Sequence, residues 1–388
     1  MTPASCYIAN ASVLVDGRMQ RLDVGVEDGR VTTLAPAPHN PRDLPVIDAD
    51  GLSVVPGFID LHTHGAVGVD VNAADVEGLR KIGRFFASQG VTSWHCSVLT
   101  DTPEQTSWCM GQARAMIEAG AYDGARLAGI HLEGPCLSSE YKGAMPEHLL
   151  MHEASPELFR RYQEEAGGHV TYVTLAPEVP GAEALVPELT RMGIVVAMGH
   201  SGATYEQCGR CVGAGVRAVT HLGNAMRLFH QHEPSIFGIA LERDELYVEA
   251  ICDGRHLVPA TVRLYLAAKG WDRVVAITDS IMAAGLPDGS YKLGVNDVVV
   301  VDGDAKLADS GVRAGSTLTL AQALRNIRRF TGCDLAHAAR LLGENPARLM
   351  GWADRGRIAC GCAADLVFLD EHDQIVRTMV EGRTVFEA

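Results

Sequence analysis

Two histidines one residue apart, His62 and His64, end the apolar stretch VPGFIDLHTHG at residues 55–65. In an extended strand the side chains at i and i+2 share a face, so both imidazoles can point at one target while Thr63 points away. Two neutral imidazoles that converge at a strand end form half of a site for a metal such as zinc. A hydrogen-bonded surface pair is the alternative. The run of strand, Pro-Gly, acid and HxH-Gly favours the metal.

Three further residues of metal-ligand type follow apolar stretches later in the chain. Glu133 stands in GIHLEGP, His200 in AMGHS and His221 in VTHLGNAM. Each of them alone could be an ordinary hydrogen-bonded residue of the core. Together with the two earlier histidines they form a set that suffices for one metal ion and offers ligands for a second. His131 lies two residues before Glu133 and shares its face, but we leave it outside this set.

A carboxylate, Asp279 in AITDS, follows the last apolar stretch. Beside a metal site, a carboxylate can accept a proton from an attacking water and later deliver that proton to a leaving group. The alternative is an aspartate that caps the next helix, a task that Ser280 could perform instead. Because Asp279 follows a strand opposite the histidine-bearing ones, we expect it to act as a general base and then as a general acid.

Eight apolar stretches alternate with helix-periodic ones, which is the pattern of parallel strands connected by helices. Eight repeats predict an α/β fold with a (β/α)8 TIM-like barrel, whose chemistry lies at the carboxyl ends of its strands. Six of the eight stretches end in or near His, Asp or Glu, whereas barrel cores prefer branched apolar residues. The expected strands span residues 53–60, 90–98, 126–133, 170–177, 193–200, 216–222, 246–253 and 273–279. The expected helices include residues 76–89, 103–119, 156–166 and 205–214.

The two ends of the chain have a different pattern, with short alternating runs separated by turns, which indicates hairpins. The N-terminal end contains LDVGVEDGRVTTLAP, and the C-terminal end contains GRIACGCAADLVFLDEH. Chain termini often lie close together at a domain surface. We therefore expect one small β-sandwich domain built from residues 1–55 and 355–388, and a barrel domain from residues 56–354.

The composition excludes several classes of partner. The chain has 388 residues and a net charge of −15, which disfavours nucleic acid and anionic membrane surfaces. No stretch has the uncharged apolar length of a membrane span and no signal peptide begins the chain, so we expect a cytoplasmic protein. The 10 scattered cysteines fit small buried residues in a reducing compartment. A small molecule is the expected partner.

Seven motifs, taken in order along the chain, closely resemble those of the N-acetylglucosamine-6-phosphate deacetylases of the amidohydrolase superfamily. They are PGFIDLHTHG, HLEGP, GHSGATYEQ, THLGNAM, DGRH, ITDS and AGSTLTL. The resemblance covers nearly the whole chain, and HLEGP with GHS and THLGNAM is much narrower than HxH alone. It implies metal-assisted hydrolysis of the N-acetyl group of an amino-sugar phosphate by a homodimer, with Asp279 as the general base and then the general acid.

The resemblance also implies roles for other residues. Glu133, His200 and His221 fall on the main metal ligands of the family. His62 and His64 fall on a second metal site, so one or two divalent ions are expected, with zinc first and iron, manganese or cobalt as alternatives. The implied substrate contacts are Ala144, Met145, Asn224, Ala225, His232, His256, Arg313, Ala314 and Gly315.

Three departures from the family pattern fall near the substrate. The family loop after HLEGP continues to KGAH, whereas this chain has KGAM, and the thioether of Met145 cannot donate a hydrogen bond; His148 is a candidate replacement. His232 stands where the family has an arginine that reaches a phosphate across the dimer interface, and imidazole cannot fork onto a phosphate as guanidinium does. The third departure is Arg313, which precedes AGSTLTL where the family more usually has a small or apolar residue. Arg313 or Arg227 could supply the missing cation from another direction.

The metal and proton-transfer residues are complete, so the hydrolytic chemistry is better supported than phosphate recognition. Two alternative functions stay open. One is a deacylase of a different or non-phosphorylated N-acyl substrate, and the other is an amidohydrolase that acts on a cyclic amide or an N-acyl amino acid. A noncatalytic binding protein on the same fold would be expected to have lost Asp279 or a histidine ligand, and the sequence retains them all.

Overall fold

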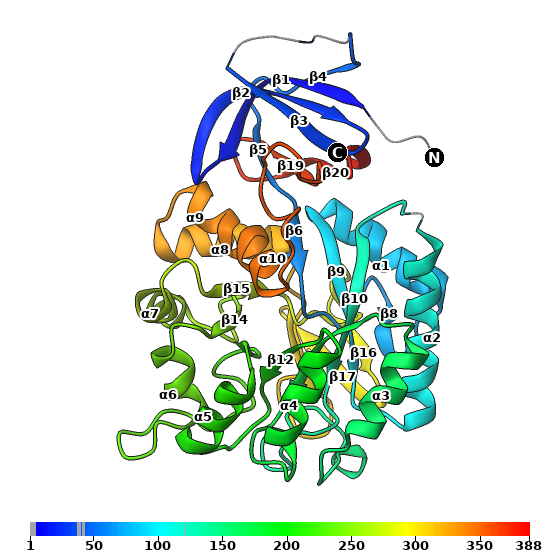
Figure 1. Cartoon of the computed structure of the whole chain (residues 1–388), viewed down its shortest axis with the longest axis vertical. Helices are drawn as coiled ribbons and strands as arrows, with labels where there is room; N and C mark the ends of the chain where they lie inside the picture. The colour runs from blue at the N-terminus through cyan, green and yellow to red at the C-terminus, as the bar shows by residue number, and fades with distance from the viewer. Residues whose placement is uncertain (1–4, 37–39, 41–42, 121) are drawn as a thin grey trace.

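A sheet of eight parallel strands forms the core of the computed structural model, which describes residues 5–36, 40, 43–120 and 122–388 (Figure 1). Each barrel strand pairs with the next barrel strand along the chain. The predicted α/β fold with a (β/α)8 barrel is confirmed. The strands are β6 (Phe58–Asp60), β9 (Val91–Leu99), β10 (Arg126–Glu133), β11 (Val170–Leu175), β12 (Val195–Met198), β13 (Ala218–Val219), β14 (Tyr247–Ile251) and β15 (Val274–Ile277).

The barrel closes through the segments that follow its first and last strands. The hydrogen-bonded path runs from β6 to β15, and the residues just beyond these two strands complete the ring. The Asp279 amide donates to the His62 carbonyl at 2.8 Å, and the His64 amide donates to the Ser280 carbonyl at 2.7 Å. The backbone therefore holds the first histidine pair beside the aspartate.

Helices connect the barrel strands, and all four helices predicted from the sequence are present. Thr102 and Thr204 begin two of them, and the Thr204 side chain forms a reciprocal capping box with Gln207. Figure 1 shows α8 and α10 between the barrel and the sheet that contains both ends of the chain. The helices are α1 (Val76–Ser88), α2 (Pro103–Ala119), α3 (Pro156–Glu165), α4 (Ala182–Arg191), α5 (Tyr205–Ala214), α6 (Ser235–Glu242), α7 (Pro259–Lys269), α8 (Leu320–Thr331), α9 (Leu335–Ala339) and α10 (Asn345–Leu349), with short turns η1 (Val71–Ala73), η2 (Glu147–Leu149) and η3 (Arg340–Glu344).

Both ends of the chain contribute to a second sheet of eight strands, which lies at the top of Figure 1. The Val31 amide at one end of this sheet donates to the Cys362 carbonyl at 2.9 Å, so the sheet curves back on itself around its own apolar core. The strands are β1 (Cys6–Val15), β2 (Arg18–Glu27), β3 (Arg30–Ala35), β4 (Val46–Asp48), β5 (Ser53–Pro56), β19 (Leu366–Leu369), β20 (Ile375–Val380) and β21 (Arg383–Glu387).

The expected first barrel strand, residues 53–60, is divided between the two sheets. Ser53–Pro56 is β5 of the terminal sheet, and Phe58–Asp60 is β6 of the barrel. Gly57 separates them, and a Cβ there would lie 2.1 Å from Thr92 Oγ1, so the chain can pass this point only without a side chain. The domain boundaries at residues 55 and 355 stay a prediction, and residues 1–4, 37–39 and 41–42 of the predicted N-terminal segment lie outside the described residues.

A small antiparallel sheet that the sequence analysis did not predict follows β15. Its strands are β16 (Gly289–Leu293), β17 (Asn296–Val301) and β18 (Asp304–Leu307), and a further two-stranded ribbon is made by β7 (Gly65–Ala66) and β8 (Val69–Asp70). The inner side chains of β16 to β18 pack against residues at the carboxyl ends of the barrel strands.

Among the described residues, no helix is both long and apolar enough to cross a membrane.

Candidate active site

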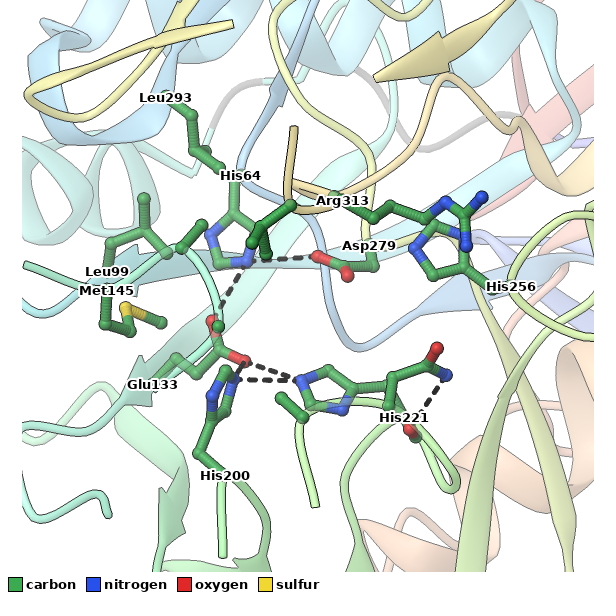
Figure 2. Close-up of a pocket in the computed structure, with 16 residues that line it drawn as sticks. His64, Leu99, Glu133, Met145, His200, His221, His256, Asp279, Leu293 and Arg313 are labelled. Carbon is green, nitrogen blue, oxygen red and sulfur yellow. Dashed lines mark hydrogen bonds and ion pairs between the residues drawn. The ribbon is translucent and has the colours of Figure 1, made fainter. Parts of the chain in front are cut away.

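The carboxyl ends of the barrel strands bring all five predicted metal ligands and Asp279 together. Figure 2 shows these residues except His62. They form two groups, and within each group one ligand atom of every residue lies within 4.8 Å of the others. All six residues are buried. One group consists of His62, His64 and Asp279, and the other of Glu133, His200 and His221.

The Glu133 carboxylate lies between the two groups. Its Oε1 atom is 3.0 Å from His200 Nε2 and 3.1 Å from His221 Nε2. On the other side, Oε2 is 3.2 Å from His64 Nε2, and Oε1 is 3.4 Å from His62 Nε2. One carboxylate thus faces four imidazoles, which is the arrangement of a bridging ligand.

Acceptors determine the tautomer of three of these four histidines. The Nδ1 atom of each lies within hydrogen-bond distance of a carboxylate or carbonyl oxygen. Such an oxygen can only accept, so Nδ1 must carry the proton. The Nε2 atom of each ring then has a lone pair and faces Glu133. The contacts are His62 Nδ1 to Glu249 Oε2 at 3.2 Å, His64 Nδ1 to the Ser97 carbonyl at 3.0 Å, and His200 Nδ1 to the Tyr141 carbonyl at 3.0 Å.

Lone pairs that face one another at short range need a cation between them. The Nε2 atoms of His62 and His64 are 3.2 Å apart, and those of His200 and His221 are 3.1 Å apart. Each pair also faces the carboxylate of Glu133, which in its ionised form can only accept hydrogen bonds. Imidazole nitrogens with carboxylate oxygens suit zinc and neighbouring transition metals. The residues therefore fit a divalent metal.

The same negative charge attracts protons when no metal is bound. Burial lowers the pKa of His64, but Asp279 and Glu133 raise it more, to about 9. Burial also lowers the pKa of His62, and Glu133, Glu249 and Asp279 raise it well above its usual range. Burial raises the pKa of Glu133, and the surrounding imidazoles lower it well below its usual range. Protons and metal ions therefore compete for the same nitrogens.

Three site residues have a backbone conformation that non-glycine residues rarely adopt. His200, His221 and Asp279 have φ angles of 47°, 29° and 49°. Strain of this kind concentrates where function imposes the geometry. The absence of a side chain at Gly315 lets the backbone approach the strained aspartate closely. The φ of Gly315 is 59°, and a Cβ there would lie 2.8 Å from the Asp279 carbonyl oxygen. That oxygen accepts a hydrogen bond from the Ser316 amide at 2.7 Å.

A buried carboxylate beneath the histidines was missed by the sequence analysis. Glu249 on β14 accepts from His62 Nδ1 at 3.2 Å, from the Tyr172 hydroxyl at 2.7 Å and from the His221 amide at 3.2 Å. It therefore holds one residue of each ligand group in place. A charged residue inside the apolar stretch LYVEAICD was the signal that could have revealed it.

His131 lies below this centre and belongs to neither ligand group. Its Nδ1 atom is 2.8 Å from Ser97 Oγ, and its Nε2 atom is 2.9 Å from Thr174 Oγ1. Burial and the neighbouring His62 lower the pKa of His131 well below its usual range. Both ring nitrogens have hydrogen-bond partners, so His131 packs under the His62 ring as a neutral side chain.

A cavity of about 200 Å³ opens onto the ligand residues. Seven predicted substrate contacts line it: Ala144, Met145, Asn224, Ala225, His256, Arg313 and Gly315. Ala314 is instead buried in the neighbouring apolar cluster, and His232 is exposed on the loop before α6. His148, the candidate replacement for a hydrogen-bond donor, is also exposed, on η2. The lining is completed by four residues that were not predicted from the sequence: Leu99, Gly143, Leu293 and Val312.

The two ends of the cavity differ chemically, as Figure 2 shows. Leu99, Met145 and Leu293 lie at one end, beyond His64 and Glu133, and His256 and Arg313 lie at the other.

Arg313 and His256, the two side chains of the polar end, each have a carboxylate partner. Arg313 pairs with Asp304 through Nε to Oδ1 at 2.9 Å and Nη2 to Oδ2 at 3.2 Å, and this ion pair lowers the pKa of Asp304 to about 2. His256 Nδ1 lies 2.7 Å from Asp253 Oδ2. These carboxylates reduce the positive charge that the polar end presents to an anion.

Comparison with known proteins shows the family. The model of the amidohydrolase family matches residues 53–385. The N-acetylglucosamine-6-phosphate deacetylase of Bacillus subtilis (strain 168) is 35% identical over 367 residues, which cover 94% of this chain and 92% of the relative. That of Lysinibacillus sphaericus is 33% identical and matches over 98% of this chain and 97% of its own length. This chain belongs to the N-acetylglucosamine-6-phosphate deacetylase family of amidohydrolases.

A solved structure of this family shares the fold over nearly the whole length. It is a variant of N-acetyl-D-glucosamine-6-phosphate deacetylase from Mycobacterium smegmatis in complex with N-acetyl-D-glucosamine-6-phosphate, with a TM-score of 0.91 and 33% sequence identity. The match covers 98% of this chain and 99% of that chain. The resemblance seen in the sequence motifs is thus confirmed, and membership of the amidohydrolase family implies a divalent metal.

Proposed function

We propose that this protein hydrolyses the N-acetyl group of N-acetylglucosamine 6-phosphate and releases acetate and the free amine. The observation that carries the proposal is that residues of both ligand groups, Asp279 among them, line one cavity, whose polar end holds Arg313 and His256. The activity named for relatives that match over nearly the whole chain supports the choice of substrate.

The metal ligands are part of the same proposal. Glu133, His200 and His221 would hold the main ion, and His62 and His64, which lie beside Asp279, would hold a second. When bound, a divalent metal supplies a Lewis acid that polarises the amide carbonyl and makes water a better nucleophile. Zinc is the first candidate because imidazole and carboxylate ligands suit it, with iron, manganese and cobalt as alternatives that a metal analysis distinguishes.

Asp279 performs the proton transfers of the proposed reaction. Its Oδ1 atom lies 3.2 Å from His64 Nε2, beside the metal ligands that line the cavity. Burial raises the pKa of Asp279, but the hydrogen bond with His64 and the charge of the nearby imidazoles lower it below its ordinary value, so the carboxylate is ionised. It accepts a proton from the attacking water and delivers that proton to the departing amine, which leaves poorly without one.

A second candidate function is hydrolysis of an N-acyl amino sugar that has no phosphate. The pairing of Arg313 with Asp304 favours it, because that guanidinium already has an anionic partner. The position of His232, which is exposed and outside the cavity lining, favours it as well. His256 and the backbone near Gly315 would then meet sugar hydroxyl groups.

Acetate release separates the two candidates. Metal-loaded protein is assayed with N-acetylglucosamine 6-phosphate, its galacto isomer and N-acetylglucosamine, with the metal content determined on the same sample. Turnover confined to a phosphate ester supports the first candidate, and equal kcat/KM for N-acetylglucosamine selects the second. No acetate from any of the three substrates refutes both.

We further propose that the protein is a homodimer whose contact includes the loop before α6. Leu228 and Phe229 in this loop are 60% and 58% exposed, next to the exposed His232. Neighbouring large apolar side chains on a surface loop favour a protein contact. Sedimentation of the wild type and of a Phe229→Ser variant tests this: a monomeric wild type would refute the dimer.

For the location we propose the cytoplasm, as expected from the sequence. The ten cysteines are free thiols, and eight of them are buried. A chain with ten free thiols suits a reducing compartment, where disulfides are rare.

A further inference from the structure

The apolar end of the cavity is assembled from three separate parts of the chain. Leu99 ends β9, Met145 lies in the loop after β10, and Leu293 ends β16. Their exposed fractions are 6%, 3% and 2%, and all three belong to one buried apolar cluster. In Figure 2 they lie together on the side of His64 that faces away from Arg313. We call these three residues the apolar wall.

Hydrogen bonds hold the apolar wall in place before any substrate arrives. The Gly294 amide, in the turn after Leu293, donates to Asp70 Oδ2 at 2.7 Å. The Asn296 side chain donates to the carbonyl of Ala144 at 2.9 Å, which ties the β16–β17 hairpin to the loop that carries Met145. The wall is therefore a preformed surface, and ordering it costs little when a ligand binds.

The geometry of an amide determines which part of a substrate meets this wall. A secondary amide is planar and trans, so its acyl chain and its nitrogen substituent leave the reacting group in opposite directions. In the proposed function the nitrogen carries the sugar, whose polar groups match Arg313 and His256. The acyl chain then points to the opposite end, at Leu99, Met145 and Leu293.

These side chains suit an alkyl group longer than a methyl. The apolar wall offers neither a hydrogen-bond donor nor a charge, and Met145 has an unbranched, flexible side chain that can adjust to the length of the ligand.

We propose that the apolar wall is an acyl-binding subsite and that the enzyme also hydrolyses N-propionyl and N-butyryl amino-sugar phosphates. The inference rests on the proposed function and names the acyl class of its substrates. The reaction is the same hydrolysis: water adds to the acyl carbon, the C–N bond breaks, the amine takes a proton, and the acyl group leaves as a carboxylate. Each methylene moved from water onto the wall raises kcat/KM about fourfold until the wall is filled, because burying it stabilises by about 0.8 kcal/mol.

The test compares acyl chain lengths in metal-loaded, full-length protein. The substrates are N-acetyl-, N-propionyl- and N-butyrylglucosamine 6-phosphate, and the amine product is measured. Met145→His places a polar ring in the wall, and Leu293→Asn changes the wall from a different element. Val295→His is the matched control, because Val295 is 58% exposed on the same hairpin and outside the cavity lining.

We expect the wild type to hydrolyse the propionyl compound at least as efficiently as the acetyl compound. Either wall variant lowers the ratio of propionyl to acetyl kcat/KM about fourfold, which is the gain that one buried methylene supplies, and Val295→His leaves it unchanged. If one wall variant does not fold, as its melting temperature would reveal, the other gives the result. A wild type more than tenfold slower on propionyl than on acetyl, or a ratio unaffected in the folded wall variants, overturns the subsite and leaves the proposed function standing. No hydrolysis of any of the compounds overturns both.

Discussion

Glu249 offers the sharpest test of how the metal centre is held, because it contacts one residue of each ligand group. In the wild type, His62 Nδ1 and the His221 amide each lie 3.2 Å from Glu249 Oε2. In a Glu249→Gln variant, the side-chain amide oxygen can still accept both hydrogen bonds. The new NH2 group would face the Tyr172 hydroxyl, which can turn to accept. The substitution therefore removes a charge and keeps the hydrogen-bond geometry.

The expected magnitude follows from this loss of charge. A hydrogen bond to a charged group contributes about 1.5–3 kcal/mol, and one between neutral groups about 0.5–1.5 kcal/mol. The His62 imidazole thus loses roughly 1–2 kcal/mol of the interaction that orients it and raises its basicity. This corresponds to metal binding weaker by about 5–30-fold, which overlaps the lower part of the range of about 10–100-fold typical of partners of metal-bound histidines.

Competition with a chelator of known affinity measures this difference directly. Metal-free wild type and Glu249→Gln are titrated in metal buffers, and unfolding of both is followed in the metal-free state. Tyr172→Phe is the matched control, because it removes the 2.7 Å hydrogen bond to Glu249 and keeps the charge. We expect this control to lose stability while its metal affinity stays within about threefold of the wild type.

One result would refute the reasoning. If Glu249→Gln binds metal as tightly as the wild type and only its melting temperature falls, then Glu249 supports the barrel core and does not tune the ligands.

Three further predictions concern the same site. Asp279→Asn should lower kcat by about 10²–10⁴-fold with little change in KM, because general acid–base catalysis contributes that much; steady-state kinetics with a kcat within tenfold of the wild type would contradict its role. The pKa of His64 is raised from 6.5 to about 9 in the metal-free fold, so its protonation stabilises that fold fully below pH 6.5 and no longer does so above pH 9. The melting temperature of the metal-free protein should therefore fall between these pH values, and a rise would show that another group dominates. Arg313→Met should raise KM for a phosphorylated substrate about tenfold or more and leave KM for N-acetylglucosamine unchanged; an equal effect on both substrates would mean that Arg313 does not meet the phosphate.

Most secondary structure could be predicted because it depends on nearby residues. The strand expected at residues 126–133 and the helices expected at 103–119 and 205–214 have the predicted bounds. The segment at 53–60 is the instructive exception, since its apolar pattern continues through Gly57 while the backbone passes from one sheet to another. The reason is a close approach to Thr92, which lies far along the chain and leaves no local mark.

The candidate site divides in the same way. His62, His64 and Glu133 could be identified because each follows an apolar run and has a residue type that binds metals. Glu249 was passed over because its role depends on Tyr172 and His62, which lie on other strands.

By itself, the sequence determined the residue types at the strand ends and their order along the chain, and with them the barrel, the family and the class of chemistry. Only the tertiary structure decided which nitrogens face Glu133, that Asp304 partners Arg313, and that Leu99, Met145 and Leu293 form one wall. Local propensity acts over a few residues, whereas these contacts depend on barrel closure and on the docking of the β16–β18 sheet. Side chains from distant segments share one cavity only after both have formed.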